Sequence, residues 1–190
     1  MNVAAPSSVR DHVVQELERQ VSEGRRLAAE IGEDGRPPLT PAQRWRFTSS
    51  ALLRRTLFEG HPQLEAFERH CYYGLLDRKR FSTAVALFKA AADTVVLHAL
   101  PFRLGMIRWL LQSSVAAPDA GLQAAGLWHA LSLFASTCGM CGPSEHPSLA
   151  GLCARVVQAG FLDDAGAAAL QSEESKKRRS AMQPLIEALQ

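Results

Sequence analysis

The sequence has no large excess of charge of either sign. Lysine and arginine number 21 and aspartate and glutamate 19, which gives a net charge of +2. A protein dedicated to nucleic-acid binding usually carries a stronger basic excess, so this class is disfavoured, although a local basic patch remains compatible with the balance. The apolar share of 47% argues against general disorder.

Long apolar runs are also absent. The longest apolar stretch, 90–104, is interrupted by Asp93 and Pro101 and is shorter than the roughly 18 to 20 residues that cross a bilayer. We therefore expect no transmembrane segment. The N-terminal sequence has the pattern of neither a secretory signal nor an intact transit peptide. The four cysteines are too sparse for a small secreted disulfide scaffold, so a reducing compartment is expected.

Patterns typical of phosphate loops and strands are missing as well. No glycine-rich loop leads into Gly-Lys-Ser or Gly-Lys-Thr. No stretch alternates strictly between apolar and polar residues, as a half-buried strand does. Apolar residues instead recur at three- and four-residue steps. The expected fold class is therefore all-α, and 190 residues suit one domain with a substantial core.

The clearest helical pattern lies between Pro62 and Leu100. It predicts two helices joined by the charged turn Asp77–Arg80, the second helix running from Phe81 to Leu100 and ending at Pro101. Its main apolar stripe is about 100° wide, and further apolar residues lie outside the stripe. A helix with apolar surface on two sides is typical of stacked helical hairpins.

The rest of the chain is predicted to continue this arrangement in one helical-repeat domain, 1–190. A flanking helix is expected over 8–31, stacked hairpins over 40–171 and a charged C-terminal tail over 172–190, about seven or eight helices in all. The tail predicts an exposed helix with Glu173–Lys177 and Glu174–Arg178 pairs. Its apolar stripe near the C-terminus suits either the protein's own body or a partner.

A weak internal repeat supports stacking. Residues 127–134 share a small alanine and a terminal Leu-Phe with residues 81–88, and Ala165 fits the same alanine position. The alanines, Ala84, Ala130 and Ala165, are 46 and 35 residues apart, and the second spacing is close to the roughly 34-residue period of two-helix repeats. A non-repeating helical bundle with coincidental spacing is the alternative.

Residues 73–88 resemble one pentatricopeptide repeat. In that family an aromatic residue and paired aliphatics precede a short turn, and a phenylalanine, an alanine and a Leu-Phe pair follow. Residues 159–165 are similar to part of a second copy, whereas 127–134 lacks a compact upstream turn. Tetratricopeptide repeats share much of this pattern. The resemblance implies a short α-solenoid of stacked antiparallel hairpins whose surface binds another protein.

The length, charge and repeat type are also similar to those of small pentatricopeptide-like accessory subunits on the catalytic head of the euglenozoan mitochondrial ATP synthase. That likeness implies a non-catalytic mitochondrial subunit, without a cofactor, whose partners are protein subunits of a larger complex. The alternative is an organellar RNA-binding protein that uses Lys79, Arg80 and the basic tail. About three degenerate repeats are too few for long sequence-specific RNA recognition.

Cys138, Cys141, His146 and Cys153 form the most site-like cluster. Their spacing approximates a zinc knuckle, and a turn with two glycines suits the first pair. Against this, Cys153 lies on an apolar helical face, where a buried thiol is a small hydrophobic residue. We expect no metal site; a small zinc module and a Cys138–Cys141 disulfide are the alternatives.

No catalytic residue is predicted. A nucleophilic pair of Cys71 with His98 or His129 is conceivable, but histidines on helices are usually surface or capping residues. Partner contacts instead favour aromatic and arginine anchors near turns. Trp45 suits the core equally well. The candidate anchors are Trp45, Arg46, Tyr73, Arg78 and Arg80.

Overall fold

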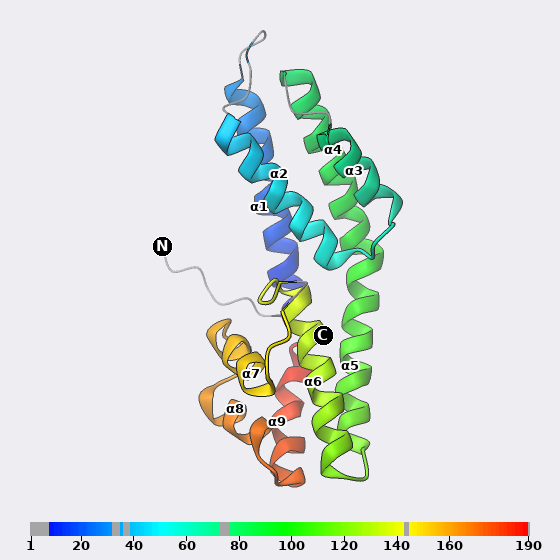
Figure 1. The fold of residues 1–190 in the computed structure, drawn as a ribbon, viewed down its shortest axis with the longest axis vertical. Helices are drawn as coiled ribbons and strands as arrows, with labels where there is room; N and C mark the ends of the chain where they lie inside the picture. The colour runs from blue at the N-terminus through cyan, green and yellow to red at the C-terminus, as the bar shows by residue number, and fades with distance from the viewer. Residues whose placement is uncertain (1–7, 32–34, 36–38, 73–76, 143–144, 190) are drawn as a thin grey trace. The chain divides into compact units, whose positions relative to one another are not determined.

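The computed structural model describes residues 8–31, 35, 39–72, 77–142 and 145–189, which form helices and turns (Figure 1). No strand occurs among these residues, so the all-α fold class is confirmed. Tyr73, which begins the pentatricopeptide-like stretch, lies outside them. The helices are α1 (Val9–Glu30), α2 (Leu39–Thr56), α3 (Pro62–Tyr72), α4 (Arg78–Thr94), the π-helical turn η1 (Val95–Ala99), α5 (Leu100–Ala116), α6 (Ala120–Thr137), α7 (Leu149–Gln158), α8 (Asp164–Gln171) and α9 (Ser175–Glu187).

The chain divides into two compact units. Unit 2 is Val14–Pro101, and unit 1 comprises the chain before Val14 and after Pro101. Each unit has its own buried side chains and is described by itself. The expected single domain over 1–190 stays a prediction, because two compact units can still unfold together as one domain.

The core of unit 2 is an aromatic cluster around Trp45. The indole ring of Trp45 lies 6.0 Å from the ring of Phe67, 5.1 Å from Phe81 and 5.9 Å from Phe88, measured between ring centroids. These four side chains come from α2, α3 and α4, and each is almost fully buried. Tilted and edge-on rings at these distances attract one another beyond the area they bury. The cluster therefore fixes α2, α3 and α4 against one another.

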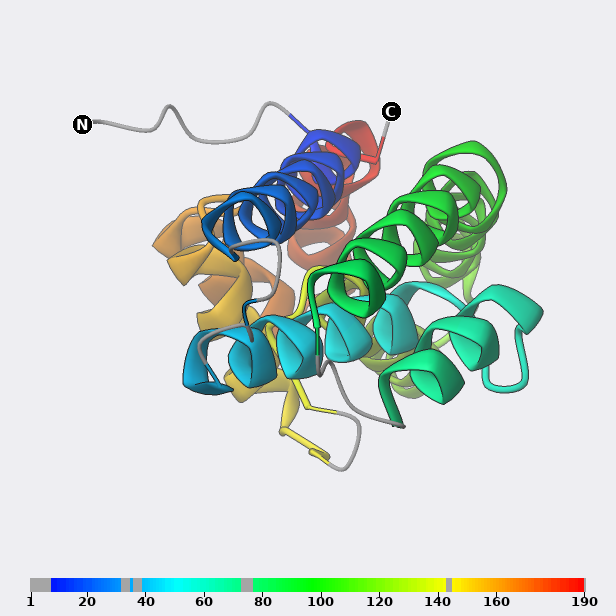
Figure 2. The same cartoon turned by 90° about the horizontal axis from the view of Figure 1, so that it is seen from above.

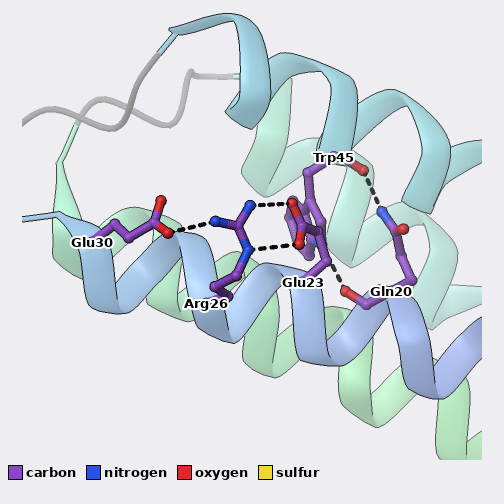
Figure 3. A network of polar contacts seen from close by, with 5 residues as sticks. All are labelled: Gln20, Glu23, Arg26, Glu30 and Trp45. Atoms are coloured by element: carbon purple, nitrogen blue, oxygen red, sulfur yellow. Dashed lines mark hydrogen bonds and ion pairs between the residues drawn. The ribbon is translucent and has the colours of Figure 1, made fainter.

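Trp45 also ties α2 to α1 through hydrogen bonds (Figure 3). Its indole N–H donates to the Gln20 carbonyl at 2.8 Å, and the Gln20 side-chain amide donates to the Trp45 carbonyl and the Ser49 hydroxyl, both at 2.9 Å. A Cβ atom on Gly24 would lie only 2.8 Å from the indole. The close approach of Trp45 to α1 therefore requires glycine at position 24.

Two sequence-based boundaries in this region were wrong. Asp77 is the cap of α4, because its carboxylate accepts the Arg80 backbone N–H at 2.8 Å, so the helix begins at Arg78 instead of Phe81. Nor does the helix end at Pro101, since helical structure continues to Ala116. Proline lacks an N–H and clashes with the preceding helical turn. The wider π-helical turn, in which residues bond five apart, accommodates this defect without ending the helix.

In unit 1, helices α6 to α9 pack in chain order. Each contacts the next, and α7, α8 and α9 lie beside one another (Figures 1 and 2). Phe134 of α6 meets the ring of Phe161 edge-on at 5.3 Å. Most other buried side chains here are small or aliphatic. They include Leu152, Val156, Ala167, Leu170, Ala181, Met182, Leu185 and Leu189.

The C-terminal tail is an integrated helix of unit 1. The predicted surface pair of Glu174 with Arg178 was wrong: Arg178 is only 5% exposed. Its guanidinium donates to the carbonyls of Leu170 at 3.3 Å, Ala120 at 2.9 Å and Ser172 at 2.6 Å. An arginine can bond several helix-terminal carbonyls at once because its donors are spread over a planar fork. Arg178 therefore joins α9 to the end of α8 and the start of α6.

The burial of matching positions can be compared among the three segments of the internal repeat. In 81–88 and in 127–134 the first, fourth, fifth and eighth residues are buried. The two segments therefore bury the same positions of the eight-residue pattern. The third copy does not follow this register, because Ala165 is exposed and Ala167 and Leu170 are buried instead. The stacking of hairpins into a solenoid stays a prediction.

Candidate functional site

A groove between α2 and α3 is a candidate site in unit 2. On α2, side chains four residues apart face the groove, as helical geometry requires. The hollow has a volume of about 450 Å³. The residues that line this α2–α3 groove are Arg46, Phe47, Ser50, Ala51, Arg54, Phe67, Glu68, Cys71 and Tyr72.

The floor of the α2–α3 groove is rigid and apolar. Phe67 is fully buried and belongs to the aromatic cluster, with its ring 5.8 Å from that of Phe88. Cys71 lies one helical turn further along α3 and is 3% exposed. Because both side chains are held by the core, the floor exists before any ligand arrives, which lowers the entropy cost of binding.

One end of the groove is closed by a charge pair. The Arg54 guanidinium donates to both carboxylate oxygens of Glu68, at 2.6 and 2.8 Å, and the Ser50 hydroxyl donates to the same carboxylate. Partial burial raises the pKa of Glu68, but the hydrogen bonds from Arg54 and Ser50 and the charge of Arg54 outweigh it, so the net pKa is lowered. This end of the groove is therefore electrically neutral.

The other end of the groove is open and aromatic. Phe47 is 61% exposed and Tyr72 is 82% exposed. Between them, Arg46 donates to the Cys71 carbonyl at 3.2 Å, and its guanidinium carbon lies 4.7 Å from the Phe47 ring centroid. Aromatic and arginine side chains are the types that dominate the energetics of protein–protein interfaces.

The predicted anchors lie in different places. Trp45 is in the core, and Arg46 lines the α2–α3 groove. Tyr73 lies outside the described residues. Arg78 and Arg80 are exposed in the first turn of α4 and do not line the groove.

Phe47 and Tyr72 are functional candidates that the sequence analysis missed. Phe47 is two positions from the buried Trp45, which turns it by about 200° to the opposite side of α2. The two-residue spacing in the sequence therefore indicates that Phe47 faces away from the core if Trp45 is buried. Tyr72, by contrast, directly follows the buried Cys71, and only the structure shows that its side chain is exposed.

The cysteine cluster does not form a metal site among the described residues, where no group of three candidate ligands comes together. Cys138 and Cys153 are buried, whereas His146 is exposed. Burial raises the pKa of the Cys153 thiol. Cys141 faces the Arg155 guanidinium at 3.4 Å, a positive charge that opposes a metal cation.

Cys71 is a poor nucleophile. Burial raises the pKa of its thiol to about 12, because the thiolate would lose its hydration, and the charge of Arg46 offsets only part of this effect. At neutral pH the group is therefore a thiol, whereas cysteine chemistry requires the thiolate. His98 is exposed and lies on η1, a different element from the one that carries Cys71.

A second apolar surface lies on α5 in unit 1. Phe102, Met106 and Trp109 follow one another at four- and three-residue steps and are 70%, 38% and 63% exposed. The helical run Arg78–Ala116 that contains them is long and apolar enough to cross a membrane by length and composition, which the sequence analysis did not expect. Core helices of soluble proteins meet the same criterion, so this run assigns no membrane location.

Comparison with known proteins finds no match: the chain matches no protein-family model, no curated protein and no solved structure.

Proposed function

We propose that this chain is a non-catalytic helical protein that binds a segment of another protein within a larger assembly. The observation that supports this proposal is the open end of the α2–α3 groove, where Phe47, Tyr72 and Arg46 stand around a rigid apolar floor. Covering exposed aromatic side chains beside a pre-formed hollow with a partner's apolar side chain lowers the free energy, because apolar surface is removed from water.

The pentatricopeptide-like resemblance extends the proposal to a named assembly. It suggests an accessory subunit on the catalytic head of a mitochondrial ATP synthase, with the nucleotide sites on other chains. Fractionation tests this extension directly. The chain is expected in mitochondria and, after mild detergent extraction, in the same native complex as the ATP synthase head. Its presence in another compartment or another complex would contradict the extension but leave protein binding in place.

Co-purification with matched variants tests the protein-binding function itself. The full-length tagged chain is isolated from the cells that produce it, as wild type, Phe47→Ala and Phe58→Ala. Phe58 is a suitable control because it is 65% exposed in the same unit and does not line the groove.

A stoichiometric set of proteins is expected with the wild type and the Phe58→Ala variant. The Phe47→Ala variant should retain less of it, by about tenfold, which is the typical effect of losing a strong interface residue. A partnerless, monodisperse chain in extracts would overturn the proposed function. Equal retention by all three chains would show that the partner binds elsewhere.

A further inference from the structure

The charges on α2 narrow the chemistry of the partner. The helix carries four arginines and no acidic residue. Arg54 is paired with Glu68, and Arg55 with Glu16, both within unit 2. Among the residues that the structure describes, none forms an ion pair with the guanidinium of Arg46, which lines the α2–α3 groove.

The surroundings of Arg46 favour contact with an anion. One guanidinium nitrogen donates to the Cys71 carbonyl, which holds the group against the end of α3. Its carbon lies 4.7 Å from the Phe47 ring centroid, and the apolar floor at Phe67 lies in the same hollow. A positive charge fixed beside apolar surface interacts more strongly with a carboxylate than a freely solvated charge does.

We propose that the α2–α3 groove binds an acidic segment of the partner protein. One carboxylate of that segment pairs with Arg46, and a neighbouring aromatic or aliphatic side chain covers the floor between Phe47 and Tyr72. This inference rests on the proposed protein-binding function and specifies the partner for the same site.

Single-stranded RNA is the main competing ligand, because bases stack on aromatic side chains and phosphates bind arginine. A chain of phosphates, however, requires a track of positive charges. Among the described residues that line the groove, only Arg46 offers a positive charge for this purpose, because Arg54 is neutralised by Glu68, whose carboxylate also lines the hollow and repels phosphate. The charge arrangement therefore favours a peptide carrying one or two carboxylates.

A displayed library of short random peptides tests the inference. Peptides are selected on the full-length wild-type chain at low salt and then measured as synthetic peptides. The selected sequences are expected to combine Asp or Glu with an aromatic or aliphatic residue. Arg46→Gln should weaken their binding about tenfold, as the loss of a charge-assisted contact does. Arg44→Gln, an exposed change outside the groove on the same helix, should alter binding less than about twofold.

Changing the peptide provides a measurement that leaves the fold untouched. Replacing each Glu of a selected peptide with Gln, one at a time, should reveal one position where binding to the wild type falls about tenfold. In the Arg46→Gln chain the same peptide change should have little effect, because the two changes remove one contact. Raised salt should weaken the acidic peptide more than its amide form.

Three results would overturn the inference. These are selected peptides without an acidic preference, equal binding to the wild type and Arg46→Gln chains, and poly(U) RNA that binds more tightly than any selected peptide and is displaced by salt. The proposed function fails in a different experiment, when no protein co-purifies with the chain. A partner that co-purifies through Phe47 but carries no acidic segment would overturn only this inference.

Discussion

The two units stabilise their interiors by different means. In unit 2, four aromatic side chains from three helices meet around Trp45. In unit 1, most buried side chains are small or aliphatic, and the buried guanidinium of Arg178 joins α9 to α6 and α8. Both units bury apolar area. Unit 2 adds the packing of aromatic rings, and unit 1 adds a buried guanidinium that satisfies backbone carbonyls. The aromatic core also provides the floor of the α2–α3 groove.

Removing the centre of the aromatic cluster should have the largest effect. Trp45→Ala is expected to lower the free energy of unfolding of unit 2 by about 3–5 kcal/mol, because it leaves a large cavity and removes the indole hydrogen bond to the Gln20 carbonyl. Urea denaturation followed by far-UV circular dichroism measures the loss. Hydrogen exchange locates it: amides of unit 2 should lose protection while those of unit 1 keep it. Equal loss in both units would show one cooperative domain.

Removing the buried guanidinium should have the next largest effect, in the other unit. Arg178→Met is expected to cost about 2–3 kcal/mol, because it leaves the carbonyls of Ala120, Leu170 and Ser172 without this donor. Lys176→Met, an exposed change on the same helix, should stay within about 0.5 kcal/mol. If both variants unfold at the same urea concentration, Arg178 does not stabilise unit 1.

Two glycine substitutions should act in opposite directions. Gly24→Ala places a methyl group 2.8 Å from the Trp45 indole, so overpacking of about 1–3 kcal/mol should exceed the gain of roughly 1 kcal/mol in helix propensity. Gly105→Ala in α5 meets nothing within 4 Å and should stabilise unit 1 by about 0.5–1 kcal/mol. Thermal unfolding of both variants checks the signs. Stabilisation by both would contradict the close approach of α1 to Trp45.

The charge pair at the groove should make the smallest contribution, and it should depend on pH. The pKa of Glu68 is lowered in the folded chain, so its contribution is present above the unfolded pKa of about 4.3 and is lost as the pH falls through the lower folded value. Because Arg54 is largely exposed, we expect less than about 1 kcal/mol. Thermal unfolding of the wild type and Glu68→Gln chains should differ near neutral pH and converge in acid. A difference that is constant with pH would exclude this pair as its cause.

The sequence predicted the helices better than it predicted which side chains are exposed. Hydrophobic spacing predicted the helical class. Short polar residues cap several helices, as Asp119 does at the start of α6. Pro101 does not end the helix as predicted, because the π-helical turn Val95–Ala99 precedes it and helical structure continues in α5. Arg178 is buried although charge pairs four residues apart indicate an exposed helix, because spacing alone does not show which face a neighbouring helix covers.

By itself, the sequence determined the class of secondary structure and the apolar character of positions such as Phe67 and Phe88. These follow from local periodicity and capping, which involve residues near one another in the chain. Only the tertiary structure decided that Trp45 is enclosed, that Tyr72 points outward and that Arg46 borders a hollow. Such properties depend on which distant helix lies against each face, and the packing of side chains far apart in the chain settles that.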